Sequence, residues 1–132
     1  MNGLAVLSGN ANPKLARNIC EHLNVPLSDV LVSQFSEGEI RVEIKENIRN
    51  CRIFVIASTR TGHINDDLME VLLILDACAR ASVQDISIVL PYFPYARADK
   101  KEQPRVPISS KVVADMIDKF NPAYLISVDL HA

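Results

Sequence analysis

Short runs of apolar residues alternate along this chain with longer stretches in which apolar residues recur every three or four positions. The short runs are typical of buried strands, and the wider spacing is typical of amphipathic helices. They predict strands at residues 4–7, 30–32, 53–56 and 86–90 and from residue 124 onward. Residues 40–45 instead alternate strictly between apolar and charged side chains, which predicts a half-exposed strand in a hairpin arm or at a sheet edge.

Two amphipathic helices are predicted in the first two thirds of the chain. The first begins at Asn12, a capping residue that precedes Pro13, and ends at residues 24–26. The second and longest follows Asn65, which we expect to be its N-cap. Acidic residues near the positive end of its dipole are Asp66, Asp67 and Glu70. Its expected buried stripe consists of Leu68, Val71, Leu72, Leu75 and Ala79.

A third helix is predicted from Ile108 to Lys119, with Ser109 as the expected cap. Its apolar face consists of Val112, Val113, Met116 and Ile117. Strands that alternate with helices through short connections predict a mainly parallel sheet flanked by helices, with residues 40–45 in a β-hairpin arm. The 132 residues fit one α/β domain with a core of its own.

Charge and composition exclude several classes of protein. A formal net charge of -2 and a pI near 5.9 argue against a general nucleic-acid binder. No apolar run approaches the length of a membrane span. The three cysteines, Cys20, Cys51 and Cys78, match neither a zinc spacing nor a disulfide framework. We interpret them as buried free thiols in a reducing cytoplasm.

The segment from Pro91 to Pro107 contains four of the seven prolines and three of the seven aromatic residues. Because proline does not fit a central sheet ladder, we expect the preceding strand to end at Leu90. Its charged residues are Arg97, Asp99, Lys100, Lys101, Glu102 and Arg105, so the segment is locally positive. A cationic loop beyond the carboxyl end of a parallel strand predicts an anion site, in particular for polyphosphate. The alternative is a solvated loop held by its prolines.

Two further places offer candidate ligands. Asp129 and His131 alternate along the last strand and point to the same side, where they can hold a divalent cation directly or through water. The alternative is a capping aspartate and a surface histidine.

Phe35, Glu37 and Glu39 precede the alternating strand. The ring can pack on a heterocycle, and the two carboxylates can accept hydrogen bonds from it. The alternative here is a polar hairpin loop with a chance aromatic residue.

Four segments, in chain order, distinguish this sequence from that of a generic α/β domain: FSEGEIRVEIKENIR, RTGHINDDLMEVLLILDACARAS, PYFPYARADKKEQPRVPIS and VDLHA. Together they resemble ribose-phosphate pyrophosphokinase, also called phosphoribosyl pyrophosphate synthetase, over essentially the whole chain. The resemblance implies a phosphoribosyltransferase-like α/β fold, with residues 1–132 as the amino-terminal of two related domains. It also implies transfer of the diphosphoryl group of Mg-ATP to ribose 5-phosphate, with Mg²⁺ as cofactor, in a homo-oligomer of dimers built into hexamers.

The resemblance also implies roles for the candidate residues. Phe35, Glu37 and Glu39 would hold the adenine of an ATP bound to a neighbouring subunit. The residues that would line the ATP and its phosphates are Arg97, Asp99, Lys100 and Lys101. His131, together with Asp129, would contact the Mg²⁺ complex. Such a transfer needs neutralised charge and aligned reactants more than a protein nucleophile.

Two features depart from the family pattern. Ala98 stands where the family has glutamine, which removes one polar contact to the nucleotide. The chain ends after VDLHA, without the family's ribose 5-phosphate loop, catalytic lysine and further metal-binding aspartate, so we expect it to be inactive alone. The alternative function is a non-catalytic nucleotide-binding or regulatory subunit that associates with full-length synthetase. A phosphoribosyltransferase is disfavoured, since no acidic pair precedes a glycine-rich phosphoribosyl loop.

Overall fold

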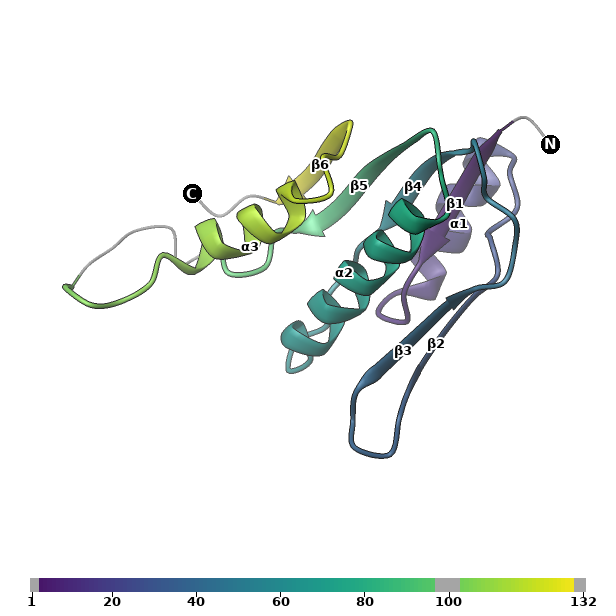
Figure 1. Cartoon of the computed structure of the whole chain (residues 1–132). Coiled ribbons are helices and arrows are strands. Elements are labelled where there is room, and N and C mark those ends of the chain that lie inside the picture. The colour runs from purple at the N-terminus through teal and green to yellow at the C-terminus, as the bar shows by residue number, and fades with distance from the viewer. Residues whose placement is uncertain (1–2, 97–102, 130–132) are drawn as a thin grey trace.

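The strands divide into a four-stranded parallel sheet and a separate two-stranded hairpin (Figure 1). The computed structural model describes residues 3–96 and 103–129, with the backbone alone for residues 128 and 129. The sheet order is β1 (Leu4–Ser8), β4 (Arg52–Ile56), β5 (Asp85–Tyr92) and β6 (Tyr124–Asp129), and every neighbouring pair is parallel. The predicted α/β class with a mainly parallel sheet is confirmed.

Helices cover the two faces of the sheet unequally. Along β1, Ala5 and Leu7 point into the larger core, which is closed by α2 (Ile64–Arg80) and α3 (Ser109–Asp118). Val6 points to the opposite face and packs with α1 (Pro13–Leu23). Figure 1 shows α2 crossing in front of the sheet and α1 lying behind β1. Within the described residues, no helix is long and apolar enough to cross a membrane.

The first helix starts as predicted. The side chain of Asn12 accepts a hydrogen bond from the Leu15 N–H at 3.1 Å, and Pro13 occupies the first helical turn, where its missing N–H costs nothing. Asn24 ends the helix in a left-handed conformation with φ of 56°. All three cysteines are buried and free, as predicted, and burial raises the pKa of the Cys78 thiol to about 12.

The start and the buried face of α2 differ from the prediction. The N-cap is His63, whose side chain makes no capping hydrogen bond, and Asn65 lies inside the first turn. The cap predicted at Asn65 is therefore wrong, because the turn closes earlier, through a bond from the Asp67 N–H to the His63 carbonyl at 2.9 Å. The buried residues of the helix are Asp67, Leu68, Glu70, Val71, Ile74, Leu75 and Cys78. Ala79 is exposed, so the buried stripe of the helix includes Ile74 and not the predicted Ala79.

Strand β5 extends two residues beyond its predicted end. It passes through Pro91 to Tyr92, so the expectation that proline would stop the strand is wrong. The physical reason is that β4 ends at Ile56, opposite Val89, and leaves that side of β5 without a neighbouring strand. The missing N–H of Pro91 therefore removes no hydrogen bond from the ladder. On the other side β6 continues, and Tyr92 pairs with Asp129.

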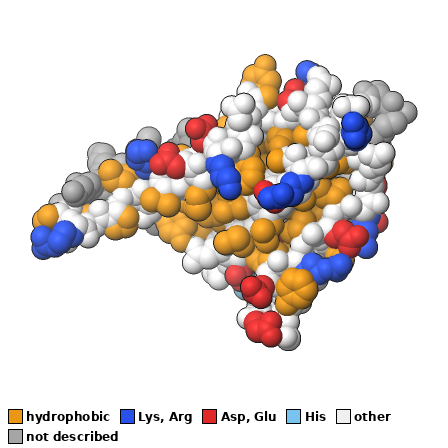
Figure 2. Space-filling model, viewed as in Figure 1, with side chains coloured by type: hydrophobic (Ala, Val, Ile, Leu, Met, Phe, Trp, Pro, Cys, Tyr) orange, Lys and Arg blue, Asp and Glu red, His pale blue; other side chains and the backbone are white. Residues whose placement is uncertain are grey.

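The third helix buries only half of its predicted apolar face. Val113 and Ile117 enter the core, whereas Val112 is 50% exposed and Met116 36%. Ile108 is the N-cap and has no side-chain cap bond, so the cap predicted at Ser109 is wrong. The exposed apolar residues border a cavity of about 400 Å³ between α2 and α3, which is visible as an apolar surface in Figure 2.

Residues 30–44 form the hairpin predicted from the alternating pattern. Strand β2 (Val30–Gln34) pairs antiparallel with β3 (Ile40–Ile44), and Val32 stands opposite Val42. Four aliphatic side chains attach the hairpin to the larger core: Val30, Val32, Val42 and Ile44. In Figure 1 the hairpin runs beside α2 and its tip extends away from the body of the domain.

Candidate functional site

The carboxyl ends of β5 and β6 bring two of the predicted site segments to one edge of the sheet. The strands are parallel neighbours, and the pairing of Tyr92 with Asp129 fixes where both end. Both strands therefore end at the same edge of the sheet. The candidate residues Arg97, Asp99, Lys100, Lys101 and His131 lie outside the described residues, and Asp129 is placed by its backbone as the last residue of β6.

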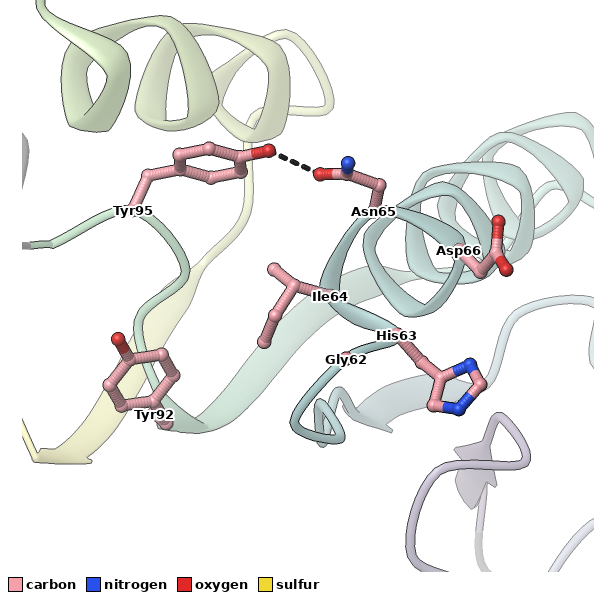
Figure 3. Close-up of a pocket in the computed structure, with 7 residues that line it drawn as sticks. All are labelled: Gly62, His63, Ile64, Asn65, Asp66, Tyr92 and Tyr95. Carbon is pink, nitrogen blue, oxygen red and sulfur yellow. Dashed lines mark hydrogen bonds between the residues drawn. The ribbon is translucent and has the colours of Figure 1, made fainter.

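The segment from Pro91 to Pro107, called the cationic segment below, is held at its start by burial and by a hydrogen bond. Phe93, Pro94 and Ala96 are all buried. Tyr95 has φ of 64°, a left-handed conformation that is uncommon for a non-glycine residue. Its hydroxyl donates a hydrogen bond to Asn65 Oδ1 on α2 (Figure 3). Burial and a polar contact therefore fix the backbone of residues 93–96, which directly precede Arg97.

A cavity of about 580 Å³ opens at this edge, lined by Gly62, His63, Ile64, Asn65, Asp66, Tyr92 and Tyr95. Figure 3 shows Ile64 projecting toward the two tyrosines, with His63 and Asp66 on the other side of the helix start. The cavity thus combines two aromatic rings with the amino end of a 17-residue helix. Such a helix end carries a partial positive charge that favours anions.

Asp67 fixes the loop between β4 and α2. Its side chain is fully buried and accepts a bond from the Arg60 N–H at 2.7 Å. It also accepts from the Arg60 guanidinium, whose Nη2 lies 2.7 Å from Oδ1. The side-chain hydrogen bond between the guanidinium and Asp67 raises the pKa of Arg60. The loop that forms one wall of the cavity is therefore tied to the first turn of the helix.

Glu70 fixes the loop between β1 and α1 in the same way. It is 7% exposed, and its Oε1 accepts a bond from the Asn10 N–H at 3.0 Å. Burial raises the pKa of this carboxyl. The close approach depends on glycine at position 9, since a Cβ atom there would lie 2.7 Å from Oε1 and the carboxylate would have to shift. Sequence reasoning treated Asp67 and Glu70 only as partners of the helix dipole and missed these contacts.

The hairpin tip stands apart from the cavity. A bond of 2.7 Å from the Phe35 N–H to the Glu39 carbonyl closes the tip, and Gly38 takes φ of 95°. Phe35 is 51% exposed, and Glu37 and Glu39 are exposed as well. Acidic side chains gather at this end of the molecule in Figure 2. The three candidate residues therefore come together with one another, but none of them lines the cavity beside Tyr92.

Metal-ligating residues do not cluster in the described part of the chain. Residues 3–96 and 103–127 contain no group of three or more histidine, cysteine, aspartate or glutamate side chains arranged to hold a metal ion. Among the predicted ligands, Asp129 stands at the carboxyl edge, next to the cavity residue Tyr92.

Comparison with known proteins first defines the class of the fold. A purine phosphoribosyltransferase from Pyrococcus horikoshii superposes with a TM-score of 0.50 at 12% identity, over 95% of this chain and 68% of that one. Phosphoribosylpyrophosphate synthetase from Mycobacterium smegmatis superposes with a TM-score of 0.93 at 38% identity, over 99% of this chain and 44% of that one. The domain is thus of the phosphoribosyltransferase-like α/β class.

Sequence comparison then defines the family. The family model for the N-terminal domain of ribose phosphate pyrophosphokinase matches residues 4–120. Ribose-phosphate pyrophosphokinases from Coxiella burnetii and Ralstonia nicotianae are 50% and 47% identical over 131 residues, 98% of this chain. The chain belongs to the ribose phosphate pyrophosphokinase family and corresponds to its N-terminal domain. It spans 40% and 41% of the lengths of these two relatives.

Proposed function

We propose that this chain is the ATP-binding part of a ribose-phosphate diphosphokinase. The complete enzyme transfers the diphosphoryl group of Mg-ATP to ribose 5-phosphate and releases phosphoribosyl pyrophosphate and AMP. In this function residues 1–132 form the amino-terminal domain, and a second related domain holds the sugar phosphate. Membership of the family supports this function. The buried free thiols support a location in the cytoplasm.

The observation that carries this function is the pairing of Tyr92 with Asp129 at the ends of two neighbouring parallel strands. ATP carries several negative charges within a short distance, so a site for it needs cations and metal ligands that converge. We infer that Arg97, Lys100 and Lys101, which follow β5, line the phosphates together with Asp99. Their fixed charges orient the triphosphate without any covalent step on the protein.

Magnesium fits the donors proposed for the end of β6. Asp129 offers oxygen ligands, which suit this hard cation, and His131 contributes directly or through a bound water. Asp129 and His131 would hold the magnesium ion, which would supply positive charge to neutralise the phosphates. The role of the chain is to hold these two donors at the sheet edge, beside the start of the cationic segment.

We further propose that the hairpin tip serves a second copy of the chain. Phe35 is half exposed, and its ring can cover an adenine that its own subunit does not bind. Glu37 and Glu39 can accept hydrogen bonds from the amino group of the base. The separation of the tip from the cavity at the sheet edge supports a homo-oligomer with shared sites.

A chimeric enzyme tests the catalytic function. Residues 1–132 of this chain would replace the matching part of the Coxiella burnetii relative, and AMP release would be measured with and without ribose 5-phosphate. We expect release that depends on the sugar, loss of at least about tenfold in activity with Arg97→Ala, and no product from the 132-residue chain alone. A chimera that folds and binds ATP but releases no AMP would instead indicate a non-catalytic regulatory subunit.

Mixing two chimeras of reduced activity tests the shared site. One carries Phe35→Ala and the other Arg97→Ala, and the two are assembled together. If the hairpin serves a neighbouring subunit, mixed oligomers contain some sites with both residues intact, and activity rises above that of either parent. If both residues act within one subunit, the mixture stays at the level of the parents, and the second-copy assignment is wrong.

A further inference from the structure

We propose that Asn10 is a positioning residue that holds the β2–β3 hairpin against the carboxyl edge of the sheet and so determines where the hairpin tip stands. The functional part of this inference rests on the function proposed above, in which the tip contacts the nucleotide. Asn10 lies in the loop between β1 and α1 and is exposed. It lies outside both the hairpin tip and the cationic segment.

The hairpin has one directional contact with the rest of the domain. Asn10 Nδ2 donates to the carbonyl oxygen of Val32, on β2, at 3.0 Å. Within residues 3–96 and 103–127, the only other hydrogen bond that leaves residues 30–44 runs from Lys45 Nζ to Glu43 Oε1 at 3.2 Å, and it joins β3 to its own flanking residue and not to the sheet or the helices. The other attachment is the packing of the four aliphatic side chains of the hairpin against the core. Because apolar packing is non-directional, it resists separation more than it resists sliding or rotation.

Asn10 can act as a fixed point because its own backbone is held. Its N–H donates to Glu70 Oε1 at 3.0 Å, and Glu70 is buried on α2. The absence of a side chain at Gly9 lets the loop come this close. The contacts thus run from the rigid helix through the loop to the hairpin strand.

The position of the Asn10–Val32 hydrogen bond along β2 lets it affect the position of the hairpin tip. Val32 lies three residues before Phe35, which is about 10 Å along an extended strand. A small rotation of the hairpin about this point therefore moves the tip by more than it moves Val32. Residues that position a substrate lose much of their effect when displaced by about 1 Å. The contact at Val32 would therefore affect nucleotide binding without touching the nucleotide.

Hydrogen–deuterium exchange of the 132-residue chain tests the structural part. In Asn10→Ala we expect the amides of residues 30–44 to exchange about five times faster, the effect of losing one net hydrogen bond. Asn10→Asp keeps the size of the side chain but cannot donate, so it should behave like alanine or worse. Asn18→Ala, on the exposed side of α1, is the matched control and should leave these amides unchanged. Unchanged exchange in both Asn10 variants would overturn the inference.

Kinetics of the chimeric enzyme test the functional part. We expect Asn10→Ala and Asn10→Asp to raise the KM for ATP about fivefold and to leave the KM for ribose 5-phosphate unchanged. A purely structural defect would change both KM values or lower the amount of folded enzyme. Faster exchange with an unchanged KM for ATP would overturn the positioning role. An inactive parent chimera would count against the proposed function alone, since the exchange experiment does not depend on activity.

Discussion

Gly9 and Glu70 lie so close together that a Cβ atom on Gly9 would stand 2.7 Å from Glu70 Oε1. In Gly9→Ala the carboxylate must move, and it then loses its bond from the Asn10 N–H in a buried environment. We expect the free energy of unfolding to fall by about 1–2 kcal/mol. Urea denaturation of the two proteins measures this difference.

Glu70→Ala provides the control for that substitution. Without the carboxylate, a methyl group at position 9 has no close neighbour left among the atoms that it would meet. We expect Gly9→Ala to cost less in this background, with a coupling of more than about 0.5 kcal/mol. An equal cost in both backgrounds would mean that the clash with Glu70 is not the cause.

Glu70 also gives the stability of the fold a dependence on pH. Burial raises the pKa of its carboxyl above the ordinary 4.5, the Asp67 carboxylate adds to this, and the Asn10 N–H opposes it. The folded state therefore keeps its proton to a higher pH than the unfolded state, and ionisation of Glu70 lowers stability as the pH rises through the interval above 4.5.

Glu70→Gln removes this ionisation and keeps an oxygen that accepts from Asn10. We expect the stability of the variant relative to the natural protein to increase as the pH rises from 4.5 and to level off above the folded-state pKa. Unfolding free energies of both proteins between about pH 4 and pH 8 measure the difference. A relative stability that falls over this interval would mean that the carboxylate is favoured, not disfavoured, in the folded state.

The apolar pattern was enough to predict the sheet class, the hairpin and the three helices, because it follows local periodicity. It could not predict that Asp67 and Glu70 would be buried. Their hydrogen-bond donors belong to two loops, and one of them, Asn10, is 60 residues away in the chain. Pro91 was misjudged for a similar reason, since its tolerance in β5 depends on where β4 ends.

The candidate site was predicted from motifs at the strand ends, and parallel neighbours necessarily end at one edge. What the sequence could not predict is which segments meet within one chain. The hairpin tip and the edge near Tyr92 are separate within this chain, and the pattern of residues along the chain does not encode that separation.

The ion pair of Arg60 with Asp67 should contribute more to stability than the other ion pairs at the surface. Asp67 is fully buried, while the Arg60 side chain is 41% exposed, so Arg60→Ala leaves a buried carboxylate with only the backbone N–H as donor. We expect a loss of about 1–3 kcal/mol in urea denaturation, which is below the value for a fully buried pair because of the exposure of Arg60.

Arg80→Ala is the matched control for Arg60→Ala. Arg80 pairs with Asp76 at 2.8 Å one turn away on the same helix, but both side chains are exposed. Its removal should cost clearly less stability than the removal of Arg60 in the same urea denaturation. If the two substitutions cost the same, burial of Asp67 does not govern the strength of its pair with Arg60.

Nucleotide binding by the chain itself should depend on Arg97 and on its neighbour Ala98. We expect weak binding of Mg-ATP in isothermal titration calorimetry, and a further loss in Arg97→Ala because one fixed charge near the phosphates disappears. Ala98→Gln restores a polar side chain beside it and should tighten binding by about three- to tenfold, the effect of one added hydrogen bond. Lys14→Ala, an exposed position on α1, removes the same charge elsewhere and should leave binding unchanged. Equal losses in Arg97→Ala and Lys14→Ala would show that ATP responds only to the net charge of the chain, and Arg97 would then have no place in the site.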